Sequence, residues 1–172
     1  MSAGLLVLRL LLAGLLFGHA SQKLFGWFRG GGPDGTATAF EAWGFRPGRT
    51  MVLLAGTCEL VAAALLAVGL ATPVAAAIVI GTMTVASAPN FAKGLWAHMG
   101  GYEVPFVYAG MAFVLALTGP GTHSIDHAAG VDDFHGVGWG ILVLVVGLAA
   151  AVPPLLSRRR NLATGGPAAD RG

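Results

Sequence analysis

Five apolar stretches dominate the chain, each long enough or nearly long enough to cross a lipid bilayer as a helix. A helix needs about 20 residues to span a hydrocarbon core of about 30 Å. Charged residues make up only 10% of the 172 residues, against about 25% in soluble globular chains, and the mean hydropathy is +0.74. We therefore predict an all-α, polytopic membrane bundle with spans at roughly 4–25, 51–71, 73–92, 104–119 and 137–156.

The connections between the spans support this division. Only Ala71, Thr72 and Pro73 join the second and third spans, which predicts an antiparallel hairpin with the proline at the first helical position. The fourth span ends at a Gly-Pro-Gly sequence, 119–121, that stops a helix. The first span is not interpreted as a signal peptide, because it lacks a basic segment and its helical pattern continues to Lys23.

Basic residues outside the spans are all predicted to lie on one side of the membrane. Eight Lys and Arg residues fall in the first loop, the third loop and the C-terminal tail, and none falls on the other side. Since Lys and Arg accumulate in cytoplasmic loops, we expect the N-terminus outside and the C-terminus in the cytoplasm. A four-span arrangement, with residues 137–156 along the surface, would break this asymmetry. The eight are Arg29, Arg46, Arg49, Lys93, Arg158, Arg159, Arg160 and Arg171.

The basic cluster at 158–160 does not indicate nucleic-acid binding, although the isoelectric point is about 9.1. It directly follows an apolar run, which is typical of a residue cluster that flanks a membrane span. The sequence after it is small and polar. Residues 158–172 are therefore predicted to form a basic, disordered cytoplasmic tail.

Five ionisable residues lie within or at the edge of the spans. A charge at the bilayer centre costs about 2.5–3.5 kcal/mol on insertion scales, so such groups usually face the bundle interior and pair. Alternatives remain for three of them: Lys23 could extend to the interface, Glu103 could lie in water, and His19 could be a structural hydrogen-bond donor. Glu59 lies near the midplane, where functional use is the default interpretation. The five are Arg9, His19, Lys23, Glu59 and Glu103.

Four of these residues are predicted to converge in the cytoplasmic half of the bundle. His19 and Lys23 are four residues apart and share one helix face, with Gln22 beside them. Glu59 and Glu103 approach from the second and fourth spans, on the same side of the membrane. Arg9 stands apart near the outer end of the first span and could instead extend outward to the interface.

Aromatic residues gather on the same side of the membrane. An interfacial belt explains such a distribution. The alternative is a flat apolar slot beside polar groups, which would suit a quinone or another amphipathic ring. The residues are Phe25, Trp27, Phe28, Phe40, Trp43, Phe45, Phe91, Trp96 and Tyr102.

The outer loop before the fifth span offers a weak metal-binding pattern. His123 and His127 are four residues apart with Asp126 between them, a set that could bind zinc or another divalent ion. Surface loops collect such residues easily, and we assign no metal site. The single cysteine, Cys58, cannot form an intrachain disulfide, and its expected role in an apolar helix is packing.

The chain resembles the DoxX family in four ordered segments: LRLLLAGLLFGHASQKLFGWF (8–28), DGTATAFEAWGF (34–45), LAGTCELVAAALLAVGL (54–70) and GGYEVPFVYAGMAFVLALTGPGTHSID (100–126). The resemblance implies a four-helix membrane protein. Members are described as subunits of membrane oxidoreductase assemblies, some linked to thiosulfate oxidation with quinone and others to thiol and superoxide defence. The matching positions include Arg9, His19, Gln22, Lys23, Glu59, Tyr102, Glu103 and Asp126.

The resemblance implies a DoxX-like core over residues 1–127. Residues 128–157 then hold the end of the outer loop and an additional transmembrane helix, and residues 158–172 the tail. This fifth span places the two termini on opposite sides, so the topology of the family core cannot simply be carried over.

The leading functional hypothesis is a membrane subunit of a redox assembly that binds a quinone or a similar small ligand. Partner oxidoreductase subunits, and in principle further copies of the chain, would join it in the plasma membrane of a bacterium or archaeon. A small-molecule or proton transporter and a non-catalytic scaffold remain alternatives. Glu59 and His19 are the predicted catalytic residues, and the ligand-binding residues are Arg9, Gln22, Lys23, Tyr102 and Glu103.

Overall fold

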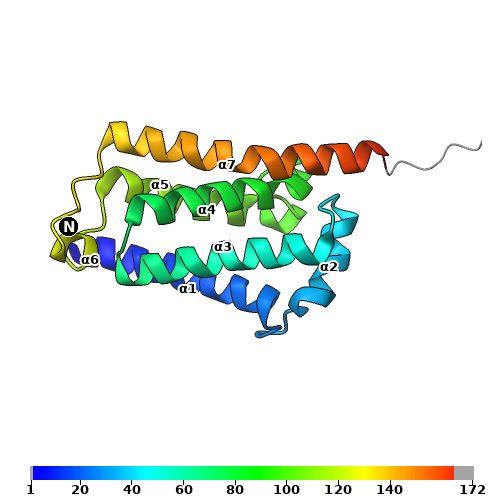
Figure 1. Ribbon diagram of the computed structural model, residues 1–172, viewed down its shortest axis with the longest axis horizontal. Coiled ribbons are helices and arrows are strands. Elements are labelled where there is room, and N and C mark those ends of the chain that lie inside the picture. The colour runs from blue at the N-terminus through cyan, green and yellow to red at the C-terminus, as the bar shows by residue number, and fades with distance from the viewer. Residues whose placement is uncertain (1, 165–172) are drawn as a thin grey trace, which may run out of the picture.

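The computed structural model describes residues 2–164 as a bundle of helices (Figure 1). No strand occurs in this part of the chain, which confirms the all-α prediction. Four helices are long and apolar enough to cross a membrane, and a fifth apolar helix is shorter. The five apolar helices are α1 (Ser2–Leu24), α3 (Gly48–Val68), α4 (Thr72–Ser87, which η1 extends to Lys93), the shorter α5 (Glu103–Thr118) and α7 (Val137–Thr164). The short ones are α2 (Gly32–Ala42), η1 (Ala88–Lys93), η2 (Ala97–Met99) and α6 (Ile125–Ala128).

Helix α4 lies at the centre of the packing. It contacts α3, α5 and α7, while α1 packs along α3 and also touches α5. Helix α2 crosses the start of α3 and contacts the end of α1. The five apolar helices run roughly parallel to one another, as Figure 1 shows, so the connections gather at the two ends of the bundle.

The two ends differ in composition. We call one the basic end; it contains α2, η1, η2 and the last turns of α7. The other, which we call the N-terminal end, contains the start of α1, the α3–α4 connection and residues 119–136. The start of α1 and the end of α7 lie at opposite ends of the bundle, as five spans require (Figure 1). The basic end carries Arg29, Arg46, Arg49, Lys93, Arg158, Arg159 and Arg160, whereas Arg171 lies outside the described residues.

The interior is built from leucine and isoleucine packed against small residues. Leu12, Leu16, Leu66 and Leu115 are fully buried, and alanines from α3, α4 and α5 fill the space between them. Large apolar side chains also cover much of the outer surface. Such a surface is suited to lipid, so the bundle places apolar groups both inside and outside, as a membrane protein does.

Helices α4 and α7 approach most closely at Gly81 and Gly147. A Cβ on Gly147 would lie 2.8 Å from Ile80 Cγ2 and 2.9 Å from the Ala77 carbonyl oxygen. Backbone atoms cannot give way as a flexible side chain can, so this crossing depends on glycine. Gly14 in α1, in contrast, has no atom within 4 Å of the position that a Cβ would take.

Helix α2 is an element that the search for spans did not predict. It lies in what was interpreted as the first loop, because its sequence is too short and too polar to span a bilayer. Local signals for it were present: Pro33 lies in its first turn with Asp34, and both residue types favour a helix start. Its C-terminal half carries Phe40, which becomes important below.

The prediction of a disordered tail from residue 158 is wrong for residues 158–164. Helix α7 continues to Thr164 because its last turns dock on the chain that follows α2. The Arg158 Nε donates a hydrogen bond to the Trp43 carbonyl (2.8 Å), and the Asn161 Nδ2 donates to the Gly44 carbonyl (2.9 Å). The rest of the predicted tail, 165–172, lies outside the described residues.

The glycine contact between α4 and α7 gives a matched test. We expect Gly147→Ala to lower the free energy of unfolding by about 1–3 kcal/mol, the usual cost of overpacking. Gly14→Ala should be neutral or slightly stabilising, because alanine has the higher helix propensity and meets no neighbour. Thermal unfolding of both variants in the same detergent measures this. Equal stability of the two would contradict the close crossing.

Candidate functional site

A buried ion pair joins α1 and α3. The Lys23 Nζ lies 2.6 Å from both Glu59 carboxylate oxygens. The Glu59 side chain is only 3% exposed and that of Lys23 20%. Glu59 lies about 16 Å along α3 at a rise of about 1.5 Å per residue, near the middle of the helix. Gly56, one turn earlier, permits the approach, because a Cβ there would overlap Leu24 and press on Lys23.

A cavity of about 440 Å³ lies beside this ion pair. Lys23 and Glu59 form part of its wall, and most of the other lining groups are apolar. Helices α3, α4 and α7 supply much of that wall, with Ala150 and Pro154 contributed by α7. The ion pair is therefore accessible to a molecule in the cavity, although it is shielded from bulk water.

Three aromatic side chains from α2 and the segment after it close the cavity. Phe40, Trp43 and Phe45 all line it, and the Phe40 ring centroid lies 5.7 Å from Trp43 and 5.8 Å from Phe45. The aromatic residues of the basic end therefore divide between the two predicted roles. These three line the cavity, although Trp43 is also 42% exposed, while five others are exposed as in an interfacial belt: Phe25, Trp27, Phe28, Phe91 and Trp96.

His19 lies next to the ion pair but outside the cavity wall. Its ring is edge-on to Tyr108 of α5, with the centroids 5.7 Å apart. Lys23 and Glu59 are close enough for their charges to act on the imidazole, and Glu59 also acts on Tyr108. Of the four residues predicted to converge, His19, Lys23 and Glu59 therefore lie together in the structure. The buried Tyr108 was not predicted, because nothing in its sequence position distinguishes it from a packing aromatic.

Three other predicted ligand-binding residues lie elsewhere. Gln22 lies beneath the turn at Gly30 rather than on the cavity wall. The Glu103 Oε2 accepts a hydrogen bond from the Ala97 backbone N–H (2.8 Å), so this carboxylate holds the η2 segment. Tyr102 stacks on Phe91 with the ring centroids 5.3 Å apart. The Glu103 carboxylate, which was expected near Glu59, is therefore absent from the cavity wall, because it is hydrogen-bonded to the η2 segment instead.

Cys58 and Thr82 are cavity residues that were not predicted. Cys58 precedes Glu59 and lines the cavity with it, so the expectation of simple packing describes its position incompletely. The Thr82 Oγ1 donates to the Ile78 carbonyl (2.8 Å), which leaves its oxygen as an acceptor beside the apolar wall. Neither residue stands in a sequence pattern that indicates a site.

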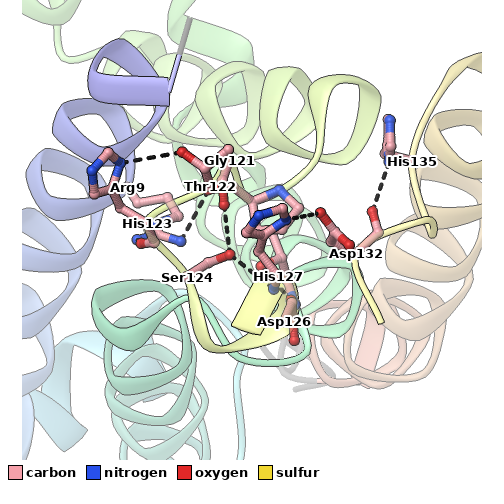
Figure 2. A network of polar contacts seen from close by, with 11 residues as sticks. Arg9, Gly121, Thr122, His123, Ser124, Asp126, His127, Asp132 and His135 are labelled. Atoms are coloured by element: carbon pink, nitrogen blue, oxygen red, sulfur yellow. Dashed lines mark hydrogen bonds and ion pairs between the residues drawn. The ribbon is translucent and has the colours of Figure 1, made fainter. Parts of the chain in front are cut away.

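Arg9 lies at the opposite end of the bundle and has a structural role there. It is 1% exposed. Its guanidinium donates hydrogen bonds to the Pro120 carbonyl (3.0 Å) and the His123 carbonyl (2.5 Å), as Figure 2 shows in part. Gly69 makes room for it, because a Cβ there would overlap the guanidinium. Arg9 thus fixes the 119–124 segment to α1, and its predicted ligand-binding role at the cavity does not fit this position.

Asp126 completes the N-terminal end by capping α4. Its carboxylate accepts hydrogen bonds from the Ala71 N–H (2.7 Å), the Thr72 N–H (2.9 Å) and the Thr72 hydroxyl (2.8 Å). Its own N–H donates to the Gly69 carbonyl (2.9 Å). The first N–H groups of a helix have no partner within it, so a loop far along the chain satisfies them here.

The outer-loop residues do not assemble into a metal centre. Within residues 2–164 no group of three or more His, Cys, Asp or Glu side chains is arranged to hold a metal ion. Asp126 faces Thr72, while the His127 Nδ1 lies 2.6 Å from Asp132 (Figure 2). This hydrogen bond lowers the pKa of the Asp132 carboxyl below its ordinary value. His123 lies near the Thr122 hydroxyl instead.

Comparison with known protein families identifies the family of the chain. The sequence model of the DoxX family matches residues 4–98, more than half of the chain. The chain belongs to the DoxX family. No curated protein and no solved structure gives a match.

The DoxX match extends from α1 to η2. It contains Lys23, Glu59, Cys58 and the aromatic side of the cavity. The wall that α7 supplies lies beyond the match, as do α5 and Tyr108. The resemblance seen in the sequence is therefore confirmed for the first part of the proposed core, and this DoxX protein completes its cavity with a helix from outside the matched region.

The Asp126 cap can be tested with a neighbouring carboxylate as control. We expect Asp126→Ala to lower the free energy of unfolding by about 1–3 kcal/mol, because buried N–H groups of α4 lose their acceptor. Asp133→Ala removes a carboxylate of the same loop that is exposed and should have little effect. Thermal unfolding in detergent compares them, and a stable Asp126→Ala protein would show that the cap is dispensable.

Proposed function

We propose that this DoxX protein is the membrane subunit of a redox assembly and binds a quinone, or a similar planar amphipathic molecule, in the cavity. The observation that carries the proposal is that a buried Lys23–Glu59 ion pair lines an apolar, aromatic-walled cavity. A buried ion pair alone is a weak indication of function, since it can be purely structural. This ion pair, however, lines a cavity large enough for a small ligand, so a bound ligand would contact it directly.

The cavity has the features of a site for such a ligand. Its volume of about 440 Å³ lies within the range of about 300–1,000 Å³ typical of small-molecule sites. Aromatic side chains stack favourably on flat rings, and Phe40, Trp43 and Phe45 provide them. The Lys23 Nζ is the strong hydrogen-bond donor of the wall, and it would bind a quinone carbonyl oxygen.

The chain's own residues would manage protons. Reduction of a quinone to a quinol consumes two electrons and two protons. We assign the electrons to a partner oxidoreductase, because the sequence contains no haem, dinucleotide or dithiol motif. Glu59 would exchange protons with the ligand, since a positioned carboxylate can act as a general acid and base. His19, beside Glu59 and Tyr108, would pass protons to and from it.

The same arrangement gives less support to transport. Between the cavity and the N-terminal end, the bundle is filled by fully buried side chains such as Leu12, Leu66 and Leu115. The loop held by Arg9 and Asp126 covers that end. A transported molecule would have to displace this core, whereas a bound ligand needs only the basic-end cavity.

Removal of the whole ion pair separates a functional role from a structural one. We expect the double variant Lys23→Met, Glu59→Leu to fold, because apolar residues of similar size often replace buried ion pairs at little cost. Its affinity for a short-chain benzoquinone should fall by about tenfold or more, since hydrogen bonds to charged groups contribute about 1.5–3 kcal/mol. Quenching of Trp43 fluorescence measures binding, in a background where Trp27, Trp96 and Trp139 are replaced by Phe.

A second readout avoids fluorescence artefacts. Cys58 is the single cysteine and lines the cavity, so bound quinone should slow its modification by a methanethiosulfonate reagent. This protection should be present in the parent protein and lost in the double variant. A stable double variant with unchanged quenching and unchanged protection would show that the ion pair is structural.

The asymmetry of charge supports an orientation for the assembly. We propose that the basic end faces the cytoplasm of a bacterial or archaeal cell, because Lys and Arg accumulate on that side. A fluorescent-protein fusion at the C-terminus should then fluoresce, and an alkaline phosphatase fusion at the same point should be inactive. An active phosphatase fusion would reverse the orientation and place the cavity toward the outer face.

A further inference from the structure

A second cavity, which we call the α4–α5–α7 groove, lies at the basic end. Its volume is about 470 Å³, and it shares no lining residue with the cavity beside Lys23. It extends from Met83 and Ala109, inside the bundle, to Arg158 and Phe91 near the end. The full lining is Met83, Thr84, Ser87, Ala88, Phe91, Tyr102, Pro105, Phe106, Ala109, Leu155 and Arg158.

The inner part of the groove presents an apolar surface despite its two hydroxyl groups. The Thr84 Oγ1 donates to the Ile80 carbonyl (2.7 Å), and the Ser87 Oγ donates to the Met83 carbonyl (2.8 Å). Both donors are therefore satisfied within α4 itself. A polar ligand would gain little here, whereas a hydrocarbon chain would replace the lipid that otherwise contacts these residues.

The rim of the groove is aromatic and positively charged. Phe91 and Tyr102 stack on each other, and Phe106 lies edge-on to Tyr102 with the centroids 6.5 Å apart. Arg158 of α7 also lines the groove. Aromatic residues of this kind lie at the head-group level of membrane proteins, so the rim is placed at the lipid interface and the inner part at acyl-chain depth.

Arg158 carries a charge that no acidic side chain of residues 2–164 balances. Its Nε donates to the Trp43 carbonyl and its guanidinium lies over the Phe45 ring, 5.8 Å from the centroid, which leaves its two terminal nitrogens without a hydrogen bond among the described residues. Arg159 and Arg160 follow on the same helix and are exposed. An arginine fork binds phosphate oxygens in a bidentate manner, and clustered basic residues beside a span attract anionic lipids.

We propose that the α4–α5–α7 groove binds one anionic phospholipid, with an acyl chain in the groove and the phosphate on Arg158. Apolar depth, an aromatic rim and an unbalanced guanidinium occur in the order in which a phospholipid presents its chain, its interface and its head group. Arg159 and Arg160 add positive charge close to the groove. This charge favours a lipid whose head group has a net negative charge over a zwitterionic lipid. This inference is independent of the proposed ligand in the first cavity.

Native mass spectrometry of the full chain in detergent tests the assignment, with phosphatidylglycerol and phosphatidylcholine as probes. The first phosphatidylglycerol should bind more tightly than phosphatidylcholine. Arg158→Gln should weaken it by about tenfold, as expected for a charge-assisted hydrogen bond. Arg160→Gln, which removes the same charge outside the groove, should have a much smaller effect. Arg158→Lys should retain part of the affinity.

A substitution in the groove itself provides a second test that does not depend on the folding of the Arg158 variants. Ala88→Leu narrows the groove and leaves Arg158 and its bond to Trp43 in place, and it should also weaken the first phosphatidylglycerol. Equal losses in Arg158→Gln and Arg160→Gln would show diffuse attraction and overturn the site. Tight binding that survives Ala88→Leu, or displacement of the lipid by inorganic phosphate, would overturn the role of the groove.

Discussion

The cost of a carboxylate in the middle of a bilayer is the constraint on which the site depends. An ionised group at this depth must be paired, and Lys23 meets Glu59 with both carboxylate oxygens at 2.6 Å. This pairing requires α1 to approach α3 closely, which Gly56 allows. The position of the two helices, the depth of the charges and the wall of the cavity are therefore consequences of one interaction. If either charge were absent, the remaining one would destabilise the bundle strongly.

The charged side chains at the two ends of the bundle have different kinds of partners. At the N-terminal end, Arg9 and Asp126 are buried and bind backbone groups of distant segments. Their hydrogen-bonding capacity is largely used inside the protein. At the basic end, both cavities have a cation in the wall, Lys23 in one and Arg158 in the other. Polar groups that remain accessible beside apolar space are the groups that can recognise a ligand, and for this reason both proposed ligands are assigned to the basic end.

The sequence predicted the bundle well and the site in part. Long apolar stretches determine membrane helices almost by themselves, and the cost of burial singled out Lys23 and Glu59, which pair in the structure. The same reasoning could not distinguish a carboxylate that reaches the cavity from Glu103, which a nearby N–H binds first. It also grouped Arg9 with ligand-binding residues, because the partners of Arg9 are carbonyl groups, which carry no sequence signal. Phe40 and Trp43 became cavity residues only through α2, a helix too short to be recognised by hydropathy.

Helix α7 contributes side chains to both cavities. It lies outside the matched DoxX region, yet it supplies Ala150 and Pro154 to the first cavity and Leu155 and Arg158 to the second. The same Arg158 binds the Trp43 carbonyl, so one side chain connects the rim of the groove with the aromatic wall of the cavity. A group bound at Arg158 would hold this connection in place. In this chain, a helix from outside the matched region therefore supplies part of the wall of the first cavity and the cation of the second.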